Sequence, residues 1–105
     1  MSGTERIVIE GLGGVGGFGC GISDLSRALN GSVAPPGTLN VSTGSGPIEF
    51  PAFRADTSRL TEFVPARTLR RIDHFSRLAL LGGYLALADA GLADTEHHRL
   101  GVVIA

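Results

Sequence analysis

Seven glycines occupy the eleven positions from Gly11 to Gly21, and this run constrains the local structure more than any other feature. Glycine loses more backbone entropy on folding than other residues, so a helix is costly to start inside the run. We therefore expect turns and close backbone approaches here. A short helix is predicted directly afterwards, because Ser23 or Asp24 can cap its start and Gly31 can end it.

Two apolar segments predict strands near the two ends of the sequence. Residues 6–10 contain three consecutive β-branched residues, and residues 100–105 read LGVVIA. Continuous apolar strands are typical of parallel sheets that are buried on both faces. Two strands alone make a marginal sheet. We therefore expect an α/β fold in which residues 1–105 form an incomplete domain, the opening segment of a larger one.

The middle of the chain predicts mostly irregular structure. Residues 31–47 carry no charge and consist mainly of turn-forming residues, which indicates a surface loop. Residues 48–53 predict a short extended segment, and Pro51 is expected to break it.

A long helix is predicted in the second half. Pro65 suits the first turn of a helical segment, and apolar residues then recur at helical spacing from Leu69 onward. Asp73 can cap the main helix, which is expected to run to Ala90 and to stop at Gly91.

Composition excludes several classes of function. The chain has 105 residues, a formal net charge of -1 and a single cysteine. The near-neutral charge argues against a dedicated nucleic-acid binder, and one cysteine rules out an internal disulfide framework. The N-terminus lacks a signal-peptide pattern, and the most apolar segment, residues 78–88, is shorter than the roughly 20 residues that cross a bilayer. We expect a cytoplasmic protein without a membrane partner.

The segment Gly11–Gly16 matches the dinucleotide-binding pattern G-x-G-x-x-G after a predicted strand. Further glycines delay the following helix, and Pro35 and Pro36 stand where an acidic residue should hold the ribose. The pattern therefore favours a glycine turn at which backbones pack closely. A small Rossmann-type dinucleotide-binding domain is the alternative.

Four residues are candidates for catalytic or metal-binding groups by residue type. Cys20 precedes a predicted helix, as some reactive thiols do, but no histidine lies near it in sequence. His97 and His98 are adjacent, so their side chains point in different directions, and they are expected in an exposed loop. His74 beside Asp73 is expected to be solvated or locally hydrogen-bonded. The sequence predicts no metal site.

The charge pattern shows a basic patch that the net charge conceals. Residues 59–77 hold five arginines against two acids, a local net charge of +3. Arg67, Arg70 and Arg71 stand at i, i+3 and i+4 and should share one helical face. The patch is either an ordinary solvated helix face or a docking patch for an acidic partner, with bidentate contacts to phosphate or carboxylate.

The order of these elements resembles the N-terminal segment of β-ketoacyl synthases. The first half, IVIEGLGGVGGFGCGISDLSRALNGSVAP, is similar to the family's opening strand, glycine turns and helix. The second half, ARTLRRIDHFSRLALLGGYLALADAGLADTEHHRLGVVIA, resembles its basic run, Asp-x-Phe element, Ala/Leu-rich helix, D-A-G-L turn and following strand. The R-R-x-D-x-F stretch fits the elongating synthases of fatty acid or polyketide synthesis best.

The resemblance implies a thiolase-like α/β/α layered fold with two similar halves, in a homodimer or heterodimer. It implies decarboxylative condensation of a malonyl thioester on acyl carrier protein with an acyl group held on a cysteine. The family's catalytic cysteine and two histidines lie downstream of this segment. Neither Cys20 nor any of the three histidines matches them, so the segment alone is expected to be inactive.

One binding role follows from the same resemblance. In relatives, the basic residues ahead of the Asp-x-Phe element help to dock acyl carrier protein, and the matching residues here are Arg67, Arg70 and Arg71. The phosphopantetheine arrives on the carrier protein, so no cofactor is expected on this chain. The rest of the synthase chain would be the other partner. A stand-alone carrier-protein docking module is a further alternative.

Overall fold

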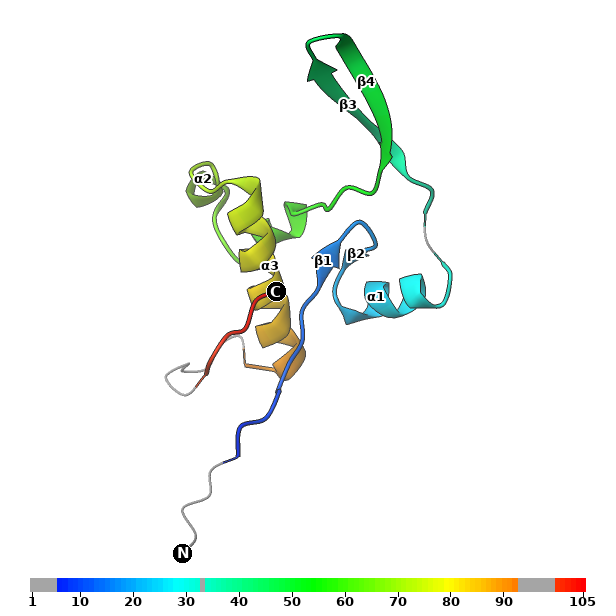
Figure 1. Cartoon of the computed structure of the whole chain (residues 1–105). Coiled ribbons are helices and arrows are strands. Elements are labelled where there is room, and N and C mark those ends of the chain that lie inside the picture. Colours follow the sequence, from blue (N-terminus) through cyan, green and yellow to red (C-terminus); the bar gives the residue numbers. More distant parts are fainter. Residues whose placement is uncertain (1–5, 33, 93–99) are drawn as a thin grey trace, which may run out of the picture.

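The computed structural model describes residues 6–32, 34–92 and 100–105. Over these ranges the chain is a small mixed α/β structure with three α-helices and two two-stranded antiparallel sheets. Its radius of gyration is 17.7 Å, against about 13 Å for a compact domain of this length. The excess arises because one hairpin and the N-terminal segment project from the helices (Figure 1).

The glycine-rich run forms a tight hairpin that leads into the first helix. Strand β1 (Val15–Gly16) pairs with β2 (Gly19–Cys20), and α1 follows as Ile22–Leu29. The helix is where the sequence predicts it, but its N-cap is Gly21, at φ 91°, and neither Ser23 nor Asp24 caps it. Asp24 instead accepts a hydrogen bond from the backbone N–H of Cys20, at 3.0 Å, and so ties β2 to the helix.

The predicted surface loop at residues 31–47 is wrong for most of its length. Strand β3 (Gly37–Thr43) pairs antiparallel with β4 (Gly46–Ala52) around a two-residue turn. The pairing sets Leu39 opposite Phe50 and Val41 opposite Ile48, so the hairpin has one apolar face. Pro51 does not break β4 either. A proline fits an edge strand at a position whose amide faces away from the paired strand.

The second half confirms the predicted helix and its ends. A 3₁₀ helix, η1 (Ser58–Glu62), leads to α2 (Ala66–Leu69) and then α3 (His74–Ala90). The side chain of Asp73 accepts a hydrogen bond from the N–H of Ser76 and caps α3. Gly91 ends α3 in the left-handed conformation, at φ 72°.

A small core joins η1, α2 and α3. The buried residues in the described part of the chain are all apolar: Leu60, Val64, Leu69, Leu81 and Leu85. At its edge the rings of Phe63 and Tyr84 stack, with centroids 5.0 Å apart. The core therefore fixes α2 and η1 on one side of α3.

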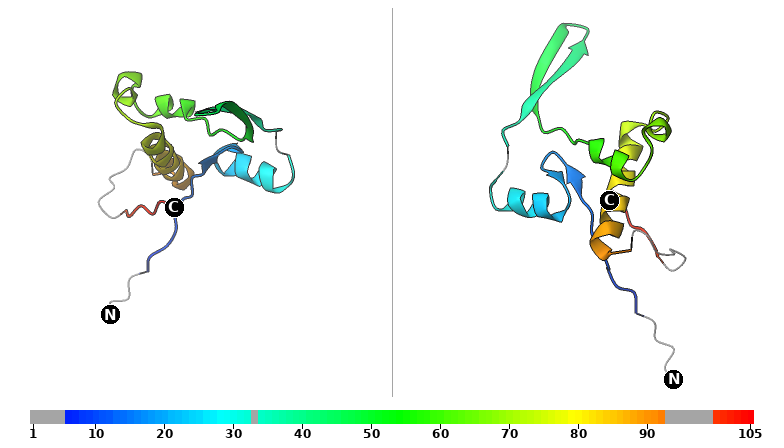
Figure 2. Two further views of the ribbon diagram at one scale, coloured as in Figure 1. Left: turned by 45° about the horizontal axis from the view of Figure 1, so that its top comes forward. Right: turned by 180° about the vertical axis from the view of Figure 1, so that it is seen from behind.

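The segment before β1 runs along α3 (Figure 2). A Cβ added at Gly13 would meet the backbone of Gly82 and would come within 2.7 Å of the Ala86 nitrogen. The N–H of Leu12 donates to the carboxylate of Asp89 at 3.0 Å, which fixes the segment against the last turns of the helix. Gly13 therefore allows close backbone packing, which is the interpretation that the sequence favours for this glycine turn.

The two predicted apolar strands are absent from the described residues. Residues 6–10 and 100–105 belong to no sheet. A strand needs a hydrogen-bonded neighbour, and neither segment has one here. Ile7 is 100% exposed and Val103 96% exposed, so these side chains are largely uncovered. The expected parallel sheet is replaced by two separate antiparallel hairpins.

Candidate functional site

The arginine cluster, defined as Arg67, Arg70 and Arg71, is carried by α2 and the turn that follows it. Pro65 is the N-cap of α2, and Leu69 is buried in the core between Arg67 and Arg70. The α-helix itself ends at Leu69. Arg70 keeps a helical backbone at φ -60° and ψ -24°, and the N–H of Arg71 reaches the carbonyl of Thr68 at 3.4 Å. The cluster therefore spans one helical turn and its continuation.

A fourth arginine holds this turn in place. The Nε of Arg77 donates to the carbonyl oxygen of Ile72 at 2.9 Å, and its Nη2 donates to that of Leu69. Leu69 is the last residue of α2, and its carbonyl also accepts from the N–H of Ile72 at 3.1 Å, whereas Ile72 lies three residues further on. Arg77 thus stabilises the backbone that carries the cluster, a role that the sequence pattern alone did not indicate.

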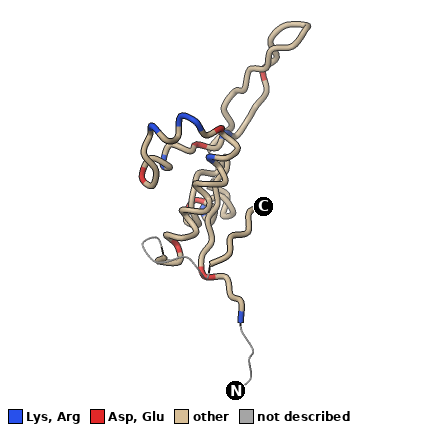
Figure 3. Tube along the Cα trace, turned by 90° about the vertical axis from the view of Figure 1, so that its left-hand side faces the viewer, with Lys and Arg blue, Asp and Glu red and all other residues tan. Residues whose placement is uncertain are grey.

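All three cluster side chains are exposed and line one hollow with Thr68 and Ile72. Within the described ranges, none of their guanidinium groups forms an ion pair or a hydrogen bond. Basic positions gather in the part of the chain that carries α2 (Figure 3). The cluster can therefore accept an anionic group without first breaking an internal contact.

Arg59 differs from the cluster because its side chain has hydrogen-bond partners, one of which is 39 residues away in the sequence. Its Nη1 donates to the Sγ of Cys20 at 3.4 Å, and its Nη2 lies 3.4 Å from a carboxylate oxygen of Glu62. These hydrogen bonds, that to Cys20 first, raise the pKa of Arg59. Cys20 is half-buried and packs against the core. Among the described residues, the side chain that contacts the Cys20 thiol is thus that of an arginine and not of a histidine.

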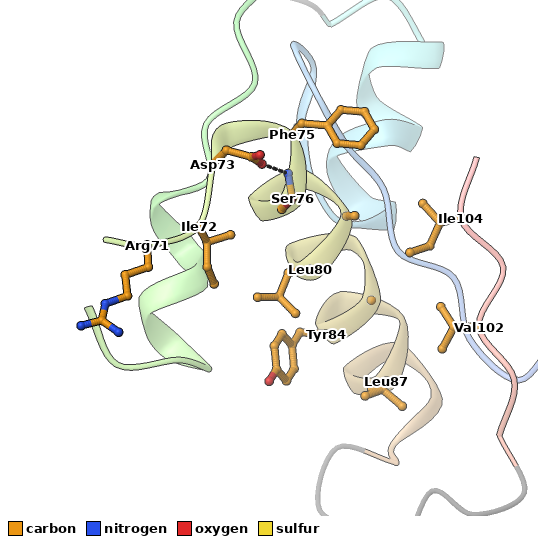
Figure 4. A pocket seen from close by; sticks show the side chains of 12 residues that line it. Arg71, Ile72, Asp73, Phe75, Ser76, Leu80, Tyr84, Leu87, Val102 and Ile104 are labelled. Atoms are coloured by element: carbon orange, nitrogen blue, oxygen red, sulfur yellow. Dashed lines mark hydrogen bonds between the residues drawn. The ribbon is translucent and has the colours of Figure 1, made fainter. Parts of the chain in front are cut away.

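An apolar groove of about 810 Å³ runs beside the cluster (Figure 4). Its floor is α3, from Phe75 through Leu80 and Tyr84 to Leu87, and Val102 and Ile104 face it from the C-terminal segment. Arg71 lines this groove as well as the hollow of the cluster. The surface next to the basic cluster is therefore largely apolar.

The other candidate residues of the sequence are not brought together into a site by the described part of the structure. The described part of the chain contains no group of three or more potential metal ligands. His74 is exposed at the first position of α3, and His97 and His98 lie outside the described residues. No helix in the described ranges is long and apolar enough to span a membrane.

The glycine pattern does not have the context of a dinucleotide-binding turn. No strand precedes Gly11 in the described residues, and Gly16 lies in β1. A second strand then intervenes before α1 begins at Ile22. The dinucleotide fingerprint requires a strand, the turn and the helix in direct succession, with the helix N-terminus at the pyrophosphate. The local geometry therefore does not support the dinucleotide alternative.

The cap at Asp73, beside the cluster, makes α3 sensitive to acid. Hydrogen bonds from Ser76, the backbone N–H first, hold the pKa of Asp73 below its ordinary value of 3.8. A lowered pKa in the folded chain stabilises it above pH 3.8, and this contribution is lost as the pH falls through the lowered value. Asp73→Asn keeps a capping side chain but should reduce the loss of helical circular dichroism as the pH falls below 3.8.

The control is Glu49→Gln, because the side-chain carboxylate of Glu49 accepts no hydrogen bond from the described residues. It should leave the acid transition unchanged. An acid transition that Asp73→Asn does not alter would contradict the role of this carboxylate. Asp56, whose pKa the N–H of Ser58 lowers in the same way, provides a second acid-sensitive contact that remains in both variants.

Comparisons of the chain with known protein families, with curated proteins and with solved structures found no match.

Proposed function

We propose that this chain is the N-terminal portion of an elongating 3-oxoacyl-[acyl-carrier-protein] synthase, and that the arginine cluster docks acyl carrier protein. The segment supplies scaffold and docking, and the catalytic cysteine and histidines belong to the rest of the synthase. The proposed complete domain has the thiolase-like layered fold. The support is the ordered resemblance along the sequence, joined to the physical state of the cluster.

The observation that carries the proposal is the contrast among the arginines of residues 59–77. The guanidinium groups of Arg59 and Arg77 donate hydrogen bonds to other residues of the chain. Arg67, Arg70 and Arg71 are exposed and have no partner in the described ranges. Three unpaired guanidinium groups around one hollow repel one another, and an anionic partner would relieve that repulsion.

The chemistry of the cluster suits the proposed partner. Acyl carrier protein is acidic and bears a phosphopantetheine arm. A guanidinium group pairs with carboxylate or phosphate through two parallel hydrogen bonds. Complementary charge at an interface raises the association rate and selects partners more than it raises intrinsic affinity. The apolar groove beside Arg71 adds a surface that the rest of a synthase would cover.

The proposed reaction requires groups that this segment does not supply. A condensing cysteine needs backbone N–H groups placed to hold an oxyanion, and the decarboxylation needs two histidines. Cys20 lies in a short hairpin with Arg59 as its side-chain partner. It is not a candidate nucleophile by resemblance. We therefore expect no condensing activity from the 105-residue chain.

The decisive test is binding of purified acyl carrier protein, measured by fluorescence anisotropy at low salt. Arg70→Glu should weaken binding by about tenfold or more, because it replaces an attraction with a repulsion at the centre of the cluster. Arg54→Glu is the matched control. Arg54 is also exposed and unpaired in the described residues, but it lies outside the cluster. It should change affinity by less than about twofold.

Two results would overturn the proposal. One is that acyl carrier protein does not bind the unaltered chain at low salt. The other is that Arg54→Glu weakens binding as much as Arg70→Glu, which would indicate attraction by general charge and not by the cluster. Raising the salt should weaken binding of the unaltered chain, because exposed charges are screened.

A further inference from the structure

The hairpin formed by β3 and β4 projects away from the helices in Figure 1 and in the right-hand view of Figure 2. Among the residues that the structure describes, its sheet contains only these two strands. Each strand therefore has one paired edge and one outer edge. Exposed outer edges are places where another strand can add by backbone hydrogen bonding.

The positions of two prolines show which backbone groups face outward. Pro47 pairs with Ser42, and Pro51 pairs with Thr38. Proline has no N–H, so these pairs occupy the positions in an antiparallel ladder that do not exchange hydrogen bonds. Such positions alternate along the strands, so Asn40 and Glu49 form the third pair of this kind.

The two outer edges consequently differ. On β4, prolines remove two of the three outward donors, and only Glu49 retains one. On β3, Thr38, Asn40 and Ser42 each present an outward N–H and an outward carbonyl. No hydrogen bond to these groups is made by the described residues. The edge of β3 is open, and the edge of β4 is blocked in the manner that natural sheets use against strand addition.

We propose that the outer edge of β3 pairs with β3 of a second copy of this chain, antiparallel about a two-fold axis at Asn40. This register sets Asn40 opposite the partner's Asn40 and Thr38 opposite the partner's Ser42. Every outward group on one copy then meets an outward group on the other. The pairing joins the two hairpins into one four-stranded sheet.

The side chains suit this register. Leu39, Val41, Ile48 and Phe50 share one face of the hairpin, and three of them are exposed. In the four-stranded sheet, Leu39 stands opposite the partner's Val41 at a closely spaced pair, which favours apolar contact. The apolar faces of the two hairpins thus become continuous. The polar side chains at 38, 40 and 42 share the opposite face.

Charge favours a second copy over an acidic or basic peptide. Strand β3 carries no charged residue, so it offers no electrostatic complement to a charged segment. The single acid of the hairpin, Glu49, would lie three strand spacings from its counterpart, about 14 Å, beyond the screening length in physiological salt. Because β4 is blocked, assembly closes at two copies and does not continue as a filament.

The interface is one strand edge, so we expect a weak dimer that forms as concentration rises. The test is sedimentation of the 105-residue chain over a wide concentration range. Asn40→Pro removes the central outward donor of β3 without removing a hydrogen bond inside the hairpin. It should raise the dimer dissociation constant by about tenfold or more. Glu49→Pro, its cross-strand match on the blocked edge, should change it by less than about twofold.

A second measurement tests the register and does not depend on how well the proline variants fold. Asn40→Cys should form a disulfide between two copies, because facing residues have Cα atoms close enough to be bridged. Glu49→Cys should not. Peptide mass spectrometry distinguishes this bridge from any that involves Cys20.

The proposal fails if the chain stays monomeric at all concentrations and Asn40→Cys does not crosslink, which would leave another extended segment as the occupant of this edge. It also fails if Glu49→Pro disrupts the dimer as strongly as Asn40→Pro. It is independent of the proposed function, because none of these measurements involves acyl carrier protein or the arginine cluster.

Discussion

Leu60→Ala should lower the free energy of unfolding by about 2–5 kcal/mol, the usual cost of truncating a fully buried leucine. Leu60 is 0% exposed and packs where η1 meets α3. Only five residues of the described chain are buried. The loss of three heavy atoms from a core this small leaves a cavity that the neighbours cannot fill without moving η1 and α2.

The measurement is urea denaturation followed by circular dichroism, with Leu29→Ala as the control. Leu29 is 79% exposed at the end of α1, so its truncation should change stability by less than about 0.5 kcal/mol. Equal losses from the two variants would contradict the assignment of the core. Because Leu69 belongs to the same core, Leu60→Ala should also weaken binding at the arginine cluster.

Gly13→Ala is the second large effect, and it concerns the close packing of the N-terminal segment on α3. The added methyl group would overlap the carbonyl of Gly82 and approach the Ala86 nitrogen to 2.7 Å. These are backbone atoms of a helix and cannot turn aside as a flexible side chain does. We expect a loss of about 1–3 kcal/mol, the usual cost of overpacking.

Gly14→Ala is the matched control, because the nearest atom to its added Cβ belongs to the ring of Phe18, at 3.4 Å. It should cost less than Gly13→Ala in the same denaturation measurement. A Gly13→Ala variant as stable as the unaltered chain would show that the segment does not pack on α3.

The unaltered chain should not bind NAD or ATP at millimolar concentration, and saturable binding would revive the dinucleotide alternative.

The main helix shows what local signals predict well. Asp73 at its start and Gly91 at its end act within one turn of the chain, through a side-chain hydrogen bond and a left-handed backbone. Neither depends on distant residues. The position of α1 was predicted for similar reasons. Its cap was wrong because Asp24 makes its hydrogen bond to Cys20, which became available only once the glycine-rich run folded into a hairpin.

The hairpin of β3 and β4 was missed although its signal is present in the sequence. Leu39 and Val41 alternate with polar residues, as do Ile48 and Phe50 with Glu49 between them. Turn-forming residues surround this alternation and favour a loop over a strand when they are read locally. A proline does not break a strand at an outer edge, because its missing N–H is not needed there.

The arginines show most clearly which features follow from the local sequence pattern and which depend on tertiary structure. Spacing alone places Arg67, Arg70 and Arg71 within about one helical turn of one another, because that follows from the geometry of a helical backbone. It does not show that Arg77 stabilises the end of α2 or that Arg59 contacts Cys20, 39 residues away. Those partners are set by the packing of η1, α2 and α3 around the buried leucines.

The position of α1, the limits and caps of α3, and the grouping of the three arginines were thus encoded within short stretches of sequence, since the interactions behind them span a few residues. Strand formation was not, because a strand exists only where another strand supplies its hydrogen bonds. Residues 6–10 and 100–105 have strong strand composition but no paired strand in the described part of the chain, whereas β3 and β4 have weaker composition and pair with each other. Tertiary proximity decided which segments became sheet and which arginines stayed free for a partner.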